Sequence, residues 1–142
     1  MLKRLDHWPG LLESFIDSRR HVPFQWGKND CVLFSCDAVL AMTGQDLARG
    51  FRDTYDTARG ALKAMHLLDA SSVGELADVF AARLGLRVLP ATFAQRGDVV
   101  LLNRELGESL GIVSLNGVDI WAPAEEGLAE IPITEGLRAW RI

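Results

Sequence analysis

Hydrophobic residues follow a helical spacing at the start of the chain. Trp8, Leu11, Leu12, Phe15 and Ile16 fall at positions i, i+3, i+4, i+7 and i+8, the spacing of an amphipathic helix. A proline at the second position of this stretch suits a first helical turn. The pattern predicts a helix that begins near Trp8 and buries one face.

A second helix is predicted from Asp30 to about Thr43. Asp30 is a suitable N-cap, and Gly44 is a suitable end. The residues between them are apolar on nearly every side, which is typical of a helix buried in the middle of a domain. Ser35 and Asp37 are the polar exceptions, so both need hydrogen-bond partners.

Two further helices follow. Residues 54–66 are predicted to be helical with Thr54 as the cap, although Gly60 interrupts the pattern. Ser72 and Glu75 have the spacing of a capping box. They introduce an apolar stripe from residue 73 to residue 84, which Gly85 ends.

The pattern changes to short strands after Gly85. The predicted strands are residues 86–89, 98–103, 111–115, 118–121, 127–133 and 137–142. Asn116-Gly117 is a strong signal for a tight hairpin, and Pro132 favours an edge position for its strand. Helices followed by hairpin-linked strands predict one α+β domain, residues 1–142, with an antiparallel sheet.

Composition narrows the classes of partner. The chain has 142 residues and a net charge of −4, which argues against nucleic acid because phosphate binding needs a basic surface. There is no run of about 18 apolar residues, so no membrane span is expected. No secretory signal is visible in the first residues.

The two cysteines are not spaced for a shared bond. Cys31 and Cys36 are five residues apart, which places them roughly 140° apart around a helix. They do not form the C-x-x-C spacing of a zinc site. We therefore expect no disulfide, metal or other cofactor, as in a protein made in a reducing compartment.

The segment from Pro23 to Cys31 carries the candidate chemistry. A Trp-Gly step is followed by the acidic cap Asp30 and then by Cys31 in the first turn of the buried helix. A helix N-terminus favours negative charge, so it can lower the pKa of a thiol. A cysteine nucleophile also needs a base within hydrogen-bond reach. The alternative is an inert core cysteine, which is the interpretation that we prefer for Cys36.

The order of several motifs resembles the NlpC/P60 group of papain-like cysteine hydrolases, which cleave peptide links in bacterial cell walls. The motifs are Trp-Gly followed by Asp-Cys at a helix start, Gly97-Asp98-Val99-Val100 on a strand, and Gly111-Ile112-Val113 on a hairpin strand. The segments 57–61, 96–100, 110–113 and 139–142 are similar to a bacteriophage-tail branch of that group. The resemblance implies a papain-like fold in which helices pack on an antiparallel sheet.

The resemblance assigns site residues but leaves the site incomplete. Cys31 matches the nucleophile position, whereas Phe24 stands where a tyrosine is usual, and Ser109 stands where the general-base histidine is expected. Trp121 takes the place of the third polar residue. Cys31 is therefore expected to be vestigial unless His21, the best of the three histidines, replaces the base.

Four polar or aromatic positions allow two interpretations. Asp98 is interpreted as fixing a turn rather than as a catalytic acid. Trp26 and Trp121, with Trp140, are either a binding platform or core residues. Phe24, Trp26, Asp30 and Trp121 are retained as candidate binding residues.

The resemblance implies a structural or assembly protein of a phage tail tip or baseplate, with other tail proteins as partners. Such a protein would be made in the bacterial host cytoplasm and located in the virion. The alternative is an active cysteine peptidase or amidase that cleaves peptidoglycan stem peptides during phage entry. A third possibility is a small-molecule or peptide binding module without a phage connection.

Overall fold

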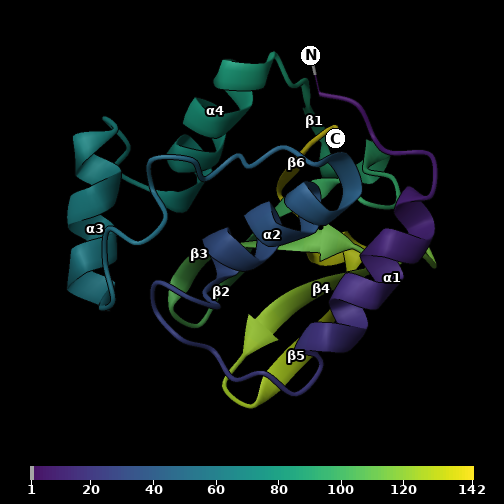
Figure 1. Ribbon diagram of the computed structural model, residues 1–142, viewed down its shortest axis with the longest axis horizontal. Helices are drawn as coiled ribbons and strands as arrows, with labels where there is room; N and C mark the ends of the chain where they lie inside the picture. The colour runs from purple at the N-terminus through teal and green to yellow at the C-terminus, as the bar shows by residue number, and fades with distance from the viewer. Residues whose placement is uncertain (1) are drawn as a thin grey trace.

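The computed structural model describes residues 2–142 and consists of four helices followed by a six-stranded sheet (Figure 1). The helices are α1 (Trp8–Arg19), α2 (Cys31–Thr43), α3 (Ala58–Leu67) and α4 (Val73–Leu84). The strands are β1 (Val88–Pro90), β2 (Val99–Arg104), β3 (Gly107–Val113), β4 (Asp119–Ala124), β5 (Gly127–Pro132) and β6 (Arg138–Trp140). Two short 3₁₀ turns, η1 (Ala91–Phe93) and η2 (Ile133–Glu135), join strands.

The sheet is antiparallel and has the strand order β1-β6-β2-β3-β4-β5. The prediction of an α+β fold with helices packed on an antiparallel sheet is therefore confirmed. Pro132 lies on β5, which is an edge strand as predicted. An edge strand tolerates proline because one row of its backbone groups has no strand partner.

The predicted helix ends are confirmed where a cap and a glycine mark them. The Asp30 carboxylate accepts a hydrogen bond from the Leu33 backbone N–H at 2.9 Å, and the Ser72 hydroxyl accepts one from that of Glu75 at 3.2 Å. Gly44 and Gly85 end α2 and α4 in the left-handed conformation. A positive φ is strained for residues that carry a Cβ, so glycine is favoured at both positions.

The predicted cap of the third helix is wrong. The helix begins at Ala58, and its cap is Thr57, whose hydroxyl accepts from the Gly60 N–H at 3.0 Å. The Thr54 hydroxyl instead donates to the Phe51 carbonyl at 2.6 Å. Thr54 therefore belongs to the turn before the helix.

Several strand boundaries differ from the prediction. β3 begins at Gly107 rather than at residue 111, because Arg104 pairs with Gly107 and a tight turn at Glu105 and Leu106 joins β2 to β3. β1 begins at Val88 rather than at residue 86. The hairpin at Asn116-Gly117 is present as predicted, between β3 and β4.

The main core lies between the helices and one face of the sheet, with α2 crossing the sheet at its centre and α1 beside it (Figure 1). A smaller core covers the other face, where Val100, Leu102 and Ile120 are buried. Buried Asp98 joins both ends of the chain to the sheet through Arg4 and Arg141 at 3.1 and 2.9 Å. No helix within residues 2–142 has the length and apolarity needed to cross a membrane.

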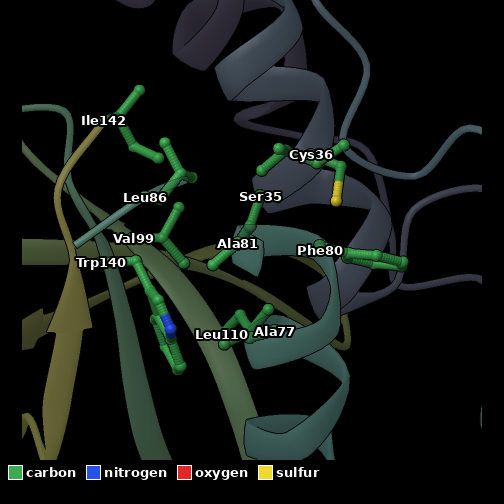
Figure 2. Close-up of a pocket in the computed structure, with 11 residues that line it drawn as sticks. Ser35, Cys36, Ala77, Phe80, Ala81, Leu86, Val99, Leu110, Trp140 and Ile142 are labelled. Atoms are coloured by element: carbon green, nitrogen blue, oxygen red, sulfur yellow. The ribbon is translucent and has the colours of Figure 1, made fainter. Parts of the chain in front are cut away.

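The two polar residues of α2 differ in their partners. Asp37 forms ion pairs with Arg19 at 2.7 Å and Arg52 at 2.5 Å. The hydroxyl of Ser35 is buried, and it has no hydrogen-bond partner among the described residues. It lines an apolar cavity of about 20 Å³ between α2, α4 and the sheet, which Figure 2 shows together with Ala81 and Val99.

We expect Ser35→Ala to stabilise the protein by about 1 kcal/mol, because a buried hydroxyl without a partner has lost its hydration and gained nothing in return. The measurement is the midpoint of urea unfolding at constant slope. Thr43→Val is the matched control, since the buried Thr43 hydroxyl donates to the Val39 carbonyl at 2.7 Å. The control should lose roughly 1 kcal/mol. A Ser35→Ala protein that loses as much as the control would contradict this interpretation.

Candidate functional site

The site forms around the N-terminus of α2, where Asp30 fixes the position of Cys31. Asp30 is only 1% exposed. One carboxylate oxygen caps α2, and the other accepts from the Gly27 backbone N–H at 3.0 Å and from the Tyr55 hydroxyl. A single side chain thus joins the Trp-Gly turn, the start of α2 and the segment that leads to α3.

Gly27 is required by the close approach of that segment. Its φ is +81°, and a Cβ built at this position would lie 2.1 Å from the Tyr55 carbonyl oxygen. No other residue can occupy such a position without moving the backbone. The glycine of the Trp-Gly step therefore allows the residue-55 segment to pack directly against the start of the site.

A groove of about 1050 Å³ opens beside Cys31. We call it the Cys31 groove. Its walls are the Phe24–Val32 segment, one face of α3 with the preceding residues, and the strand ends around Arg104, Ser109 and Pro123. Phe24 and Trp26 stand edge to face with ring centroids 4.9 Å apart, and Leu62 of α3, 45% exposed, lies on another wall. The lining is thus mainly apolar, with polar groups near Cys31.

The strand wall is open because β3 and β4 separate. Their pairing is confined to Ile112 with Trp121 and Val113 with Ile120. Before Gly111, β3 has no partner on the β4 side, and Cys31 lies at this opening. The backbone of Leu110 and the side chain of Ser109 lie near the Cys31 thiol, where hydrogen bonding from them lowers its pKa.

The Cys31 thiol is held in its neutral form. Burial raises its pKa above the ordinary value, and the hydrogen bonds from Leu110 and Ser109 offset that effect only in part. The negative charge of Asp30 raises the pKa further, while the positive charge of Arg104 lowers it. A helix N-terminus can lower the pKa of a thiol, but burial is the larger effect at Cys31.

The polar residues that the sequence singled out are only partly brought together. Cys31, Asp30, Phe24, Trp26 and Ser109 all line the Cys31 groove. Ser109 is 8% exposed. It carries a hydroxyl, not an imidazole, at the position where the sequence resemblance to NlpC/P60 hydrolases led us to look for a base.

Two other candidates lie outside the groove. His21 is exposed, and its backbone packs against Gly127 at the start of β5. Trp121 lies on the helix-covered face of the sheet, where the Arg20 guanidinium carbon is 5.1 Å from its ring centroid. No groove-lining residue among those described is a histidine. The structure therefore places neither His21 nor Trp121 beside the thiol.

Two functional residues were missed by sequence reasoning. Tyr55 lines the groove and donates its hydroxyl to Asp30, and burial beside Asp30 raises its pKa strongly. Arg104 at the end of β2 donates from its guanidinium to the Pro123 carbonyl of β4 at 3.0 Å. No local pattern marks either residue, because each reaches the site from a distant part of the chain.

The remaining interpretations from sequence concern Asp98, Trp140 and metal binding. Asp98 fixes the turn as predicted, since its carboxylate accepts from the Gln95 N–H at 2.9 Å. Trp140 is a core residue whose indole N–H donates to Asp78 at 3.0 Å. Within residues 2–142 no group of three or more His, Cys, Asp or Glu residues is arranged to hold a metal ion.

Four helices on a six-stranded antiparallel sheet, with a cysteine at the start of the central helix, define an NlpC/P60-like fold. The crystal structure of the NlpC/p60 domain of the peptidoglycan hydrolase SagA is similar, with a TM-score of 0.58 and 14% identity over 94% of this chain and 98% of that chain. This likeness shows the fold. Residues 3–142 match the family described as domain of unknown function DUF6950, so the chain belongs to that family. None of the curated proteins compared with the chain matches it.

We expect iodoacetamide to label Cys31 slowly in a Cys36→Ala background. Each unit by which the pKa is raised lowers the thiolate fraction about ten-fold near neutral pH. The rate should rise only above the ordinary thiol pKa of roughly 8.5, and unfolding in urea should abolish the protection. The measurement is the labelling rate against pH by mass spectrometry. Rapid labelling with an apparent pKa below that of a free thiol would contradict the burial argument.

We also expect the free energy of unfolding to fall as the pH rises above about 8.5. The pKa values of Cys31, Cys36 and Tyr55 are all raised in the fold. Their protons are bound more tightly in the folded state, so this stability is fully present below the unfolded pKa values and is lost on raising the pH. Each thiol contributes a slope of about 1.4 kcal/mol per pH unit.

Urea unfolding between neutral pH and pH about 10 measures this slope. Cys36→Ala removes one of the two thiols, so the variant should show a shallower decline than the wild type. A stability that stays constant across the range would show that the thiols are not protected from ionisation.

Proposed function

We propose that this chain is a non-catalytic bacteriophage tail protein that uses the Cys31 groove to hold a segment of a neighbouring tail or baseplate protein. The main support for a non-catalytic role is that no histidine is among the described residues that line the groove. The raised pKa of the Cys31 thiol agrees with it. General-base assistance is typically worth about 10²–10⁴-fold in rate. A protonated thiol without that assistance is a poor nucleophile.

The shape and lining of the groove support binding of a peptide. Aromatic rings from Phe24 and Trp26 and apolar residues of α3, including Leu62 and Met65, line it together with a few polar groups. Large concave sites with this mixture are typical of ligand and peptide binding. A volume of about 1050 Å³ is enough for a few residues of extended chain.

The phage assignment rests on short sequence segments. Residues 57–61, 96–100, 110–113 and 139–142 are similar to a phage-tail branch of NlpC/P60 proteins. In the structure these segments form the start of α3, the entry to β2, the second half of β3 and the end of β6 with the residues after it. The proposed location is therefore the tail tip of a virion, after synthesis in the host cytoplasm.

The alternative function is an active cysteine peptidase or amidase that cleaves peptidoglycan stem peptides. The retained Cys31 beside the groove favours it. Such an enzyme would need a base from outside the groove, or from the substrate itself.

We expect Cys31→Ala to restore phage assembly fully when the natural gene is deleted, because the proposed role does not use the nucleophile. Plaque counts and electron microscopy of tails measure the rescue. Purified protein should release no more fragments from peptidoglycan than the Cys31→Ala variant does. Failure of the rescue, or fragment release that depends on Cys31, would favour the hydrolase instead.

A pair of leucines on α3 tests the groove directly. Leu62 lines the groove, whereas Leu67 on the same helix is 86% exposed and does not. Leu62→Asp should therefore impair assembly, while Leu67→Asp should behave as wild type. Equal effects of the two variants would contradict a role for the groove.

A further inference from the structure

Arg104 brings a positive charge to the inner part of the Cys31 groove, and no carboxylate neutralises it. Its guanidinium donates to the Pro123 carbonyl at 3.0 Å. Among the described residues it forms no ion pair, unlike the arginines at positions 4, 19, 20, 52, 138 and 141. A guanidinium carries five N–H donors, so most of its capacity remains available to a ligand.

The strand register places Arg104 next to Ser109. Leu102 pairs with Ser109 and Arg104 pairs with Gly107. Side chains alternate along a strand, so Arg104 and Ser109 share one face and are diagonal neighbours. The contact with Pro123 holds the guanidinium across the opening between β3 and β4. The hydroxyl of Ser109, a residue more than nine-tenths buried, lies at the same place, and its one O–H can turn from the Cys31 thiol to a ligand.

The acidic residues around the groove form no ion pair with Arg104 among the described residues. Asp30 already accepts from three donors, and Glu108 accepts from the Gly74 N–H at 2.9 Å. Glu105 and Glu125 line the groove but are exposed, so water and salt screen them. The N-terminus of α2 adds further positive potential at Cys31. The inner groove therefore holds the positive charge of Arg104 beside the hydrogen-bonded carboxylate of Asp30, and its rim is negative.

We propose that the Cys31 groove binds the free C-terminal carboxylate of a peptide, which Arg104 and Ser109 hold beside Cys31. This rests on the proposed peptide-binding function and names its ligand. A guanidinium pairs with a planar carboxylate through parallel N–H···O bonds, which a lysine cannot reproduce. The last side chain of the peptide then packs on the apolar walls, and the acidic rim favours a basic residue farther from the end.

The test is an NMR titration of the full-length protein with the acetylated tripeptide alanyl-alanyl-leucine as free acid and as C-terminal amide. The acid should shift the amide signals of Ser109 and Leu110 and bind at least ten-fold more tightly than the amide. Arg104→Gln should remove that preference, and Arg104→Lys should retain only part of it. Arg96→Gln is the matched control, because Arg96 is an exposed arginine that stacks on Trp8 away from the groove.

Several outcomes would overturn the proposal. They are equal affinity for acid and amide, an Arg104→Gln protein that keeps the preference, and no binding of the acid at millimolar concentrations. Equal binding of an acetylated alanyl-glutamyl-alanine amide would also contradict it, because the site would then recognise a side-chain carboxylate rather than a chain terminus. If Arg104→Gln fails to fold, Ser109→Ala and Arg104→Lys decide the question by the same comparison. The proposed non-catalytic tail role is tested separately, by the Cys31→Ala rescue and by the pair of leucine variants.

Discussion

The buried carboxylate of Asp30 is the contact on which the site depends. It caps α2, binds the Gly27 N–H and accepts from the Tyr55 hydroxyl, so three segments meet at one side chain. Removing one partner from such a buried network leaves the others unsatisfied, which costs more than the bond itself contributes. One residue therefore fixes the position of Cys31 and of the segment that leads to α3. These two parts of the chain form two walls of the groove.

That arrangement also sets the charge of the site. A hydrolase of this kind needs a thiol that loses its proton to a nearby base, whereas here burial keeps Cys31 protonated. The polar groups that meet at the thiol are donors: the Ser109 hydroxyl and the Leu110 backbone, with the Arg104 guanidinium nearby. These donors are the groups with which the proposed site would hold a carboxylate.

Local signals predicted most of the fold but only half of the site. Caps and left-handed glycines mark α2 and α4, because those residues act on backbone groups within four positions. The start of β3 was missed because its turn at Glu105 and Leu106 lacks the residues that usually mark a hairpin. Tyr55 and Arg104 were missed for another reason: each meets its partner 19 or more positions away. Trp121 was misplaced because its side of β4 depends on where β3 and β4 separate.

The same geometry explains why one substitution at the base position would not recreate a hydrolase. An imidazole at position 109 would lie diagonal to Arg104 across the β2–β3 ladder. A neighbouring positive charge disfavours the imidazolium that proton transfer from the thiol produces. The Pro123 carbonyl would also lose its donor if Arg104 were removed to relieve this repulsion. The proposed carboxylate site thus uses serine and arginine at two positions where an imidazole and a guanidinium would repel each other once the imidazole is charged.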